Sequence, residues 1–102
     1  MIRHIVLTRF KPEITEEKIA GIYDSLADLA DKLPGALDFR GGRSQSPEQI
    51  ERGYMHGFTI DFADWDALRT YAENETHQSL GGQLVANAVG GLDGILVLDL
   101  EV

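Results

Sequence analysis

Five side chains of this sequence are the best candidates for proton transfer: His4, His56, His77, Tyr71 and Asp99. His4 and His56 each lie in an apolar run that alternates with a period of two, so each imidazole is expected on an apolar face of a strand. There the neutral ring is favoured, and it needs a hydrogen-bond partner. A single ring of this kind is usually a satisfied core residue, whereas two rings on neighbouring strands indicate a site.

His77 follows the next helical segment, six residues after Tyr71, which lies on the apolar stripe of that segment. A histidine at a helix-turn junction is commonly solvated, and a tyrosine on an apolar stripe is commonly a core residue. Asp99 interrupts an otherwise apolar strand. Its carboxylate is either solvated near the end of the sheet or holds another group such as an imidazole, and a carboxylate that orients an imidazole is a recurring general base.

The elements that must position these residues follow the order strand, helix, strand, strand, helix, strand. Apolar runs predict strands at residues 2–10, 36–44, 54–62 and 95–101. Apolar stripes at helical spacing predict helices at residues 15–33 and 64–74, with a second stripe at 80–89 in which Gly81-Gly82 marks a break or a close backbone approach. This order is that of an α+β, ferredoxin-like split βαβ sandwich with a four-stranded antiparallel sheet.

The last strand is apolar on both faces, as is Ile5-Val6-Leu7 in the first strand. Two helices cover only one face of a four-stranded sheet, and the other face of a small antiparallel sheet is normally polar. The sequence therefore predicts a homodimer that packs sheet to sheet.

Composition restricts the functional classes. The 102 residues fit one soluble domain spanning 1–102, and the net charge of −8 disfavours nucleic acids and anionic membrane surfaces as partners. The absence of cysteine excludes disulfides and a thiolate nucleophile. The chain lacks HxH and HExxH spacings, so no metal is expected, and its N-terminus lacks a signal-peptide pattern, which favours a cytoplasmic location.

Four segments carry a resemblance to a known family: the opening run Arg3–Lys11, Gly53–His56 before a strand, the Tyr71 to His77 spacing, and the closing Leu96–Asp99. Together they resemble the stress-responsive dimeric α/β-barrel (Dabb) domain over essentially the whole chain. The resemblance implies ferredoxin-like protomers whose sheets pack into a homodimeric α/β barrel. It also implies that Leu96, Leu98 and Leu100 face the partner.

The same resemblance implies a cofactor-free site, since the polyketide cyclases of this family catalyse an intramolecular aldol reaction without a cofactor. It assigns His77 as general base supported by Asp99, and Tyr71 as the group that stabilises the enolate or carbonyl oxygen. It places His4 and His56 as substrate-binding residues in one cavity with Tyr71. One departure is that Asn74-Glu75-Thr76 precedes His77 where the family commonly has a His-Pro pair.

Three functions fit these observations. The first is binding of a small hydrophobic or aromatic carbonyl compound in a cavity between helix and sheet, with cofactor-free acid/base chemistry of the cyclase or lyase type. The second is a non-catalytic stress-response or small-molecule-binding dimer, in which the polar groups satisfy one another. The third is a cofactor-free monooxygenase of the related dimeric barrel type.

Overall fold

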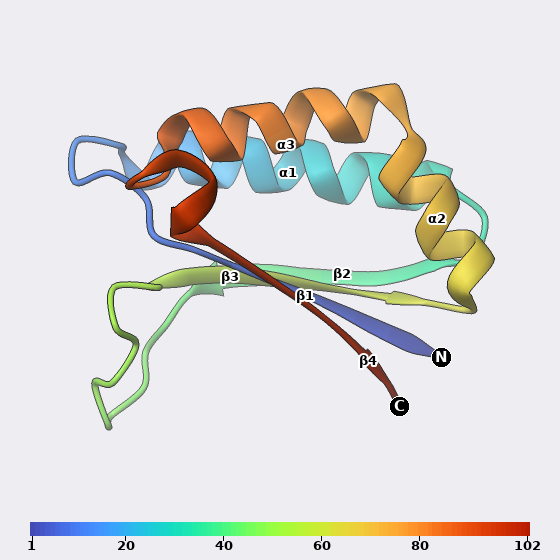
Figure 1. Ribbon diagram of the computed structural model, residues 1–102, viewed down its shortest axis with the longest axis horizontal. Coiled ribbons are helices and arrows are strands. Elements are labelled where there is room, and N and C mark those ends of the chain that lie inside the picture. The colour runs from blue at the N-terminus through green and yellow to red at the C-terminus, as the bar shows by residue number, and fades with distance from the viewer.

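Four segments form one antiparallel sheet in the computed structural model, which describes residues 1–102. The strands are β1 (Ile2–Thr8), β2 (Ala36–Arg43), β3 (His56–Phe62) and β4 (Ile95–Glu101). Their order is β2-β3-β1-β4, so β1 and β3 are the central pair, as predicted (Figure 1). The predicted ferredoxin-like α+β architecture is therefore confirmed.

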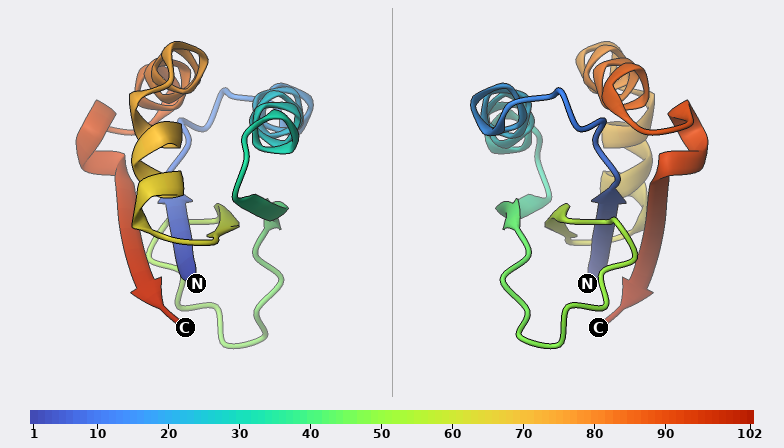
Figure 2. Two further views of the ribbon diagram at one scale, coloured as in Figure 1. Left: turned by 90° about the vertical axis from the view of Figure 1, so that its right-hand side faces the viewer. Right: turned by 90° about the vertical axis from the view of Figure 1, so that its left-hand side faces the viewer.

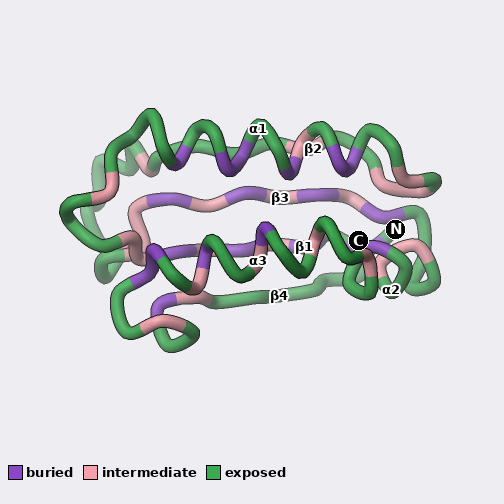
Figure 3. Tube along the Cα trace, turned by 90° about the horizontal axis from the view of Figure 1, so that it is seen from above, coloured by how far each residue is buried: buried purple, intermediate pink, exposed green.

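Helices cover one face of this sheet. They are α1 (Glu16–Lys32), α2 (Trp65–Glu73) and α3 (Glu75–Asn87), followed by the short 3-10 helix η1 (Gly91–Gly94). Each α-helix begins after a residue whose side-chain oxygen accepts a hydrogen bond from the backbone N–H three positions later, and these residues are Thr15, Asp64 and Asn74. Seen from above, α1 runs along the β2 and β3 side and α3 along the β1 and β4 side (Figure 3).

Several predicted boundaries differ from the structure. The strand predicted at 54–62 begins at His56, and the stripe predicted at 80–89 belongs to α3, which spans Glu75–Asn87. The first strand ends at Thr8 because Phe10 makes only an isolated bridge with Ala88. The expected break at Gly81-Gly82 is wrong: α3 continues through both glycines, and a Cβ at either would meet no atom within 4 Å. Burial of Leu80 and Leu84 in the core outweighs the cost of about 1 kcal/mol per glycine.

The strand register decides which side chains face the helices. His4 lies opposite Ile60 of β3 and Asp99 of β4, and these three residues share the helix-facing side. The buried core forms between this side and the helices. Leu96 and Leu98 alternate with the helix-facing residues of β4, so they lie on the uncovered outer face. Figure 2 shows β4 at one edge of the sheet, with no helix below it.

Gly41 of β2 is required by close packing under α1. A Cβ at this position would lie 2.9 Å from the Cβ of Phe58 and 3.0 Å from a ring carbon of Tyr23. Gly41→Ala is therefore expected to lower the free energy of unfolding by about 1–3 kcal/mol. Gly42→Ala is the matched control, because a Cβ there would meet nothing within 4 Å. Urea unfolding of the two variants checks this, and equal stabilities would contradict the packing argument.

Candidate functional site

A cavity of about 290 Å³ lies between α3 and the part of the sheet formed by β1 and β4. Three polar side chains of the sequence prediction line it, and these are His4 of β1, Tyr71 of α2 and His77 of α3. The remaining lining is mostly apolar and consists of Val6, Leu26, Phe58, Gly81, Leu84, Val85, Leu92, Ile95 and Val97. The structure thus brings three predicted site residues together in one apolar pocket, which we call the helix–sheet cavity.

His4 is buried and is held by Asp99. The Nδ1 atom of His4 lies 2.6 Å from Oδ1 of Asp99, which can only accept when ionised, so Nδ1 carries the hydrogen and donates it. This bond fixes the tautomer and leaves Nε2 with a free lone pair. The ring packs edge-on against Tyr71, with ring centroids 5.7 Å apart. His4 is therefore an oriented imidazole with one nitrogen available to a ligand.

His77 lies in the first turn of α3, where the cap formed by Asn74 fixes the backbone. The Asn74 side chain accepts a hydrogen bond from the His77 N–H at 3.1 Å, so a cap orients this turn in place of the expected His-Pro pair. The ring Nδ1 donates to the backbone carbonyl of Ala72 at 3.2 Å, which leaves Nε2 free. Burial lowers the pKa of His77, the Ala72 carbonyl opposes this, and a charge on His4 lowers the pKa further.

Tyr71 has a buried hydroxyl that makes no hydrogen bond within the chain. Its ring is tilted against that of His77, with centroids 4.1 Å apart. Burial raises the pKa of Tyr71, so the phenol keeps its proton and remains a donor. A buried hydroxyl without a partner is costly, and a ligand oxygen in the cavity would satisfy it.

The expected support of His77 by Asp99 is wrong. The register places Asp99 directly opposite His4, and the carboxylate binds that ring, whereas His77 uses the Ala72 carbonyl. The sequence showed that Asp99 could hold an imidazole, but the partner depends on how β4 is aligned with β1. A single sequence carries little information on that register.

His56 does not line the helix–sheet cavity, contrary to the expectation of one shared cavity. It faces the helices as predicted, but it lies opposite Thr8, four residues along the strand from the His4 position, which is a separation of roughly 13 Å. Its Nε2 instead contacts the Glu16 carboxylate at 2.9 and 3.0 Å. Glu16 lies in the first turn of α1, and nothing in its type or position in the sequence indicates this contact.

The lowered pKa of His77 predicts a pH dependence of stability. Below its ordinary value of 6.5, the unfolded chain takes up a proton on His77 before the folded chain does. The free energy of unfolding is therefore expected to fall as the pH drops below about 6.5. The stability that the neutral His77 ring contributes is fully present only above that pH. His77→Gln should weaken this dependence. Urea unfolding near pH 7 and pH 5.5 measures it, and identical pH profiles for both proteins would contradict it.

No three His, Asp or Glu side chains converge in an arrangement that could hold a metal ion. None of the helices combines the length and the apolar character needed to cross a bilayer.

Comparison with known sequences gives a match over the whole fold. The sequence profile described as Stress responsive A/B Barrel Domain (Dabb) matches residues 2–102. The stress-response A/B barrel domain-containing protein HS1 of Arabidopsis thaliana is 28% identical over 100 residues, covering 98% of this chain and 88% of that protein. Olivetolic acid cyclase of Cannabis sativa is 24% identical over 80 residues, covering 78% of this chain and 79% of the cyclase.

Solved structures give the same result. A dimeric ferredoxin-like protein of unknown function from Jannaschia sp. CCS1 is 42% identical, with a TM-score of 0.92 and coverage of 99% of this chain and 98% of that chain. The hydroxynitrile lyase of Passiflora edulis is 18% identical, with a TM-score of 0.84 and coverage of 99% and 92%. At that identity, the likeness to the lyase shows the fold alone.

Proposed function

The chain belongs to the stress-responsive A/B barrel domain family, and we propose that it binds a small apolar or aromatic carbonyl compound and moves a proton on it. The ligand occupies the helix–sheet cavity. The observation that carries this proposal is the Asp99–His4 hydrogen bond beside the unpartnered Tyr71 hydroxyl, both at an apolar cavity. Few polar groups in a mostly apolar pocket are typical of a site for a small organic ligand.

In the proposed reaction, His4 is the base. Its Nε2 takes a proton from the carbon next to the carbonyl group. The electron pair of that C–H bond forms a carbon–carbon double bond, and the π electrons of the carbonyl bond move onto its oxygen. Asp99 compensates the charge that the ring gains, as the aspartate of a catalytic triad does. Tyr71 donates a hydrogen bond to the developing enolate oxygen. Return of the proton to carbon completes an exchange, whereas attack of the enolate on a second carbonyl forms a carbon–carbon bond.

His77 serves this reaction best as a neutral acceptor. Its lowered pKa keeps the ring uncharged near neutral pH, and its free Nε2 can accept a hydrogen bond from a substrate hydroxyl. A charge on His4 lowers the pKa of His77 further, which favours the neutral form of His77 while His4 acts as the base. The name of one relative supports this class of reaction, because olivetolic acid cyclase, 24% identical over 80 residues, is a cyclase.

The proposal is tested with acetophenone in D₂O, whose methyl protons exchange only slowly in buffer. We expect the protein to speed deuterium incorporation at the methyl carbon, measured by NMR, and acetophenone to raise the melting temperature. A rise in melting temperature without exchange would support the non-catalytic binding dimer instead. Neither effect, with this ketone or with larger aryl ketones, would contradict the proposed function.

Gly81 provides a matched test of where the ligand binds. It lines the helix–sheet cavity, whereas the neighbouring Gly82 is exposed. Gly81→Leu is expected to fill the cavity and abolish both exchange and the ligand-induced thermal shift. Gly82→Leu makes the same chemical change and should keep both, and replacing glycine stabilises either helix position by roughly 0.5–1 kcal/mol. Equal binding by the two variants would place the ligand elsewhere.

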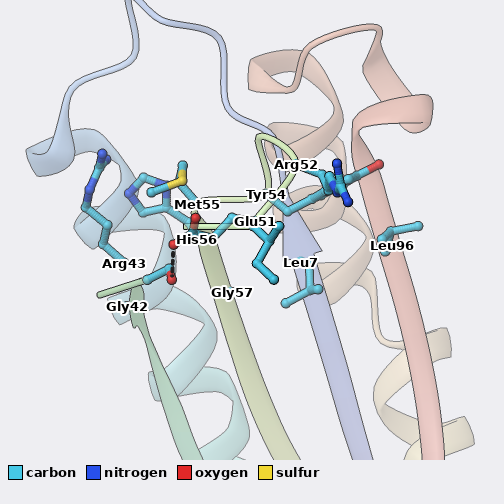
Figure 4. Close-up of a pocket in the computed structure, with 12 residues that line it drawn as sticks. Leu7, Gly42, Arg43, Glu51, Arg52, Tyr54, Met55, His56, Gly57 and Leu96 are labelled. Carbon is cyan, nitrogen blue, oxygen red and sulfur yellow. Dashed lines mark hydrogen bonds between the residues drawn. The ribbon is translucent and has the colours of Figure 1, made fainter. Parts of the chain in front are cut away.

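The proposal includes a homodimer formed through the outer face of the sheet. Leu96, Leu98 and Leu100 are each about half exposed there, at 44%, 51% and 48%. The loop of residues 44–55 extends beyond this face, on the side away from the helices (Figure 1). With Leu7 and Leu96, its side chains enclose a further cavity of about 630 Å³ that continues the apolar surface (Figure 4). A second copy covers this surface, as the dimeric neighbour suggests.

A further inference from the structure

A second polar cluster lies outside the helix–sheet cavity, where α1 begins. The side chain of His56 is buried, at 6% exposure, and its Nε2 contacts both carboxylate oxygens of Glu16. Arg43 donates from Nη1 to Oε1 of the same carboxylate at 2.9 Å. Glu16 itself is 62% exposed. Two donors of the sheet, a buried imidazole and a guanidinium that is 53% exposed, thus hold the carboxylate of a largely exposed side chain.

These groups line a cavity of about 470 Å³ between α1 and β2. Its apolar lining consists of Ile19, Ala20, Ala27, Tyr23 and Phe39. The Tyr23 hydroxyl is buried and makes no hydrogen bond. Burial raises the pKa of Tyr23, and the charge of the Glu16 carboxylate raises it further. Figure 4 shows that the side chains of Arg43 and His56 extend to the same side, toward α1.

We propose that this cluster is a binding site for small apolar or aromatic carboxylates, which displace the Glu16 side chain from His56 and Arg43. The ligand carboxylate takes over both hydrogen bonds. Its hydrocarbon part lies along Ile19, Ala20 and Phe39, and the Tyr23 hydroxyl becomes a donor to it. The Glu16 side chain then points into solvent, where its carboxylate is hydrated and little free energy is lost.

Three features favour this occupant over a neutral or cationic one. The donors present, an imidazole N–H and a guanidinium, match a carboxylate, and an imidazole and a guanidinium together can hold both of its oxygens. Glu16 fills the polar end but leaves the apolar part of the cavity empty, so a ligand with both parts buries more apolar surface. Asp24 also lines the cavity and opposes an anion, but it makes no hydrogen bond to this cluster. The site is independent of the proposed proton transfer, because it shares no residue with the helix–sheet cavity.

Benzoate is the probe for this site, followed by NMR of the histidine ring protons. In the wild-type protein, benzoate should shift the signals of His56 and Tyr23 and leave those of His77 unchanged, and benzyl alcohol should shift none of them. Glu16→Ala removes the internal competitor, so its affinity for benzoate should rise about tenfold if Glu16 occupies the donors about nine-tenths of the time. Glu17→Ala loses the same charge in the same helical turn and should change the affinity by less than about threefold.

Equal affinities of Glu16→Ala and Glu17→Ala would overturn the proposal, because net charge would then explain the binding. Shifts of His77 in place of His56 would overturn it as well. If Glu16→Ala does not fold, Arg43→Gln in the wild-type background decides the question. It should weaken benzoate binding about tenfold through loss of a charge-assisted bond, whereas the exposed Arg52→Gln should not. Unweakened binding in Arg43→Gln would also overturn the proposal.

Discussion

Asp99→Asn is expected to slow proton transfer in the helix–sheet cavity by roughly 10²–10⁴-fold. The carboxylate lies 2.6 Å from Nδ1 of His4, fixes the tautomer and compensates the charge of the protonated ring. The amide of the variant carries no charge. It can also present its NH2 group to Nδ1 in place of its oxygen, so it no longer fixes the tautomer. Because Asp99 acts through His4 and does not touch the substrate, kcat for acetophenone exchange should fall while KM stays nearly constant.

Glu101→Gln is the matched control for this prediction. Glu101 is the next acidic residue on the helix-facing side of β4, and it accepts a hydrogen bond from the Trp65 indole instead of serving the cavity. The same change of acid to amide should leave the exchange rate unchanged. If Asp99→Asn exchanges as fast as the wild-type protein while His77→Ala is inactive, His77 is the base and the assignment of His4 is wrong.

The sequence predicts the sheet and its layers well because these depend on local periodicity. Period-two alternation predicted that His4 and His56 lie on an apolar face of neighbouring strands, and both rings are buried on the helix-facing side of β1 and β3. The apolar stripe at helical spacing predicted a helix at residues 15–33, and α1 spans Glu16–Lys32. The break predicted at Gly81-Gly82 is wrong because intrinsic helix propensity is a weak effect beside burial of the neighbouring leucines.

The candidate site was predicted only in part because its contacts depend on alignment between distant strands. Because His4 and His56 share a face of the sheet, the sequence predicted one cavity for both. In the structure the two rings share that face but lie four residues apart along the strands. Asp99 was identified as a carboxylate that could hold an imidazole, yet only the register of β1 with β4 selects His4 over His77. Tyr71 and His77 lie side by side as expected, because they are close in sequence. Asn74 ends α2 and caps α3, so it sets the position of one residue relative to the other.

Leu98→Glu is expected to convert the proposed dimer to a monomer. Leu98 lies on the outer face opposite Ile5, between the exposed Leu96 and Leu100, and the helices lie on the other side of the sheet (Figure 2). A buried, unpaired glutamate costs roughly 3–5 kcal/mol, and a two-fold dimer buries two of them. That cost should raise the dissociation constant by more than about two orders of magnitude, which sedimentation at several protein concentrations measures.

The control for this variant is Leu92→Glu, which is the same chemical change at a leucine that is 72% exposed on the helix side of the molecule. It should leave the sedimentation of the dimer unchanged, because η1 lies far from the outer face. The monomeric Leu98→Glu protein should also melt at a lower temperature, and its melting temperature should not depend on protein concentration, in contrast to that of a dimer. A Leu98→Glu protein that stays dimeric with unchanged stability would show that the copies associate through another surface, and the outer leucines would then need a different partner.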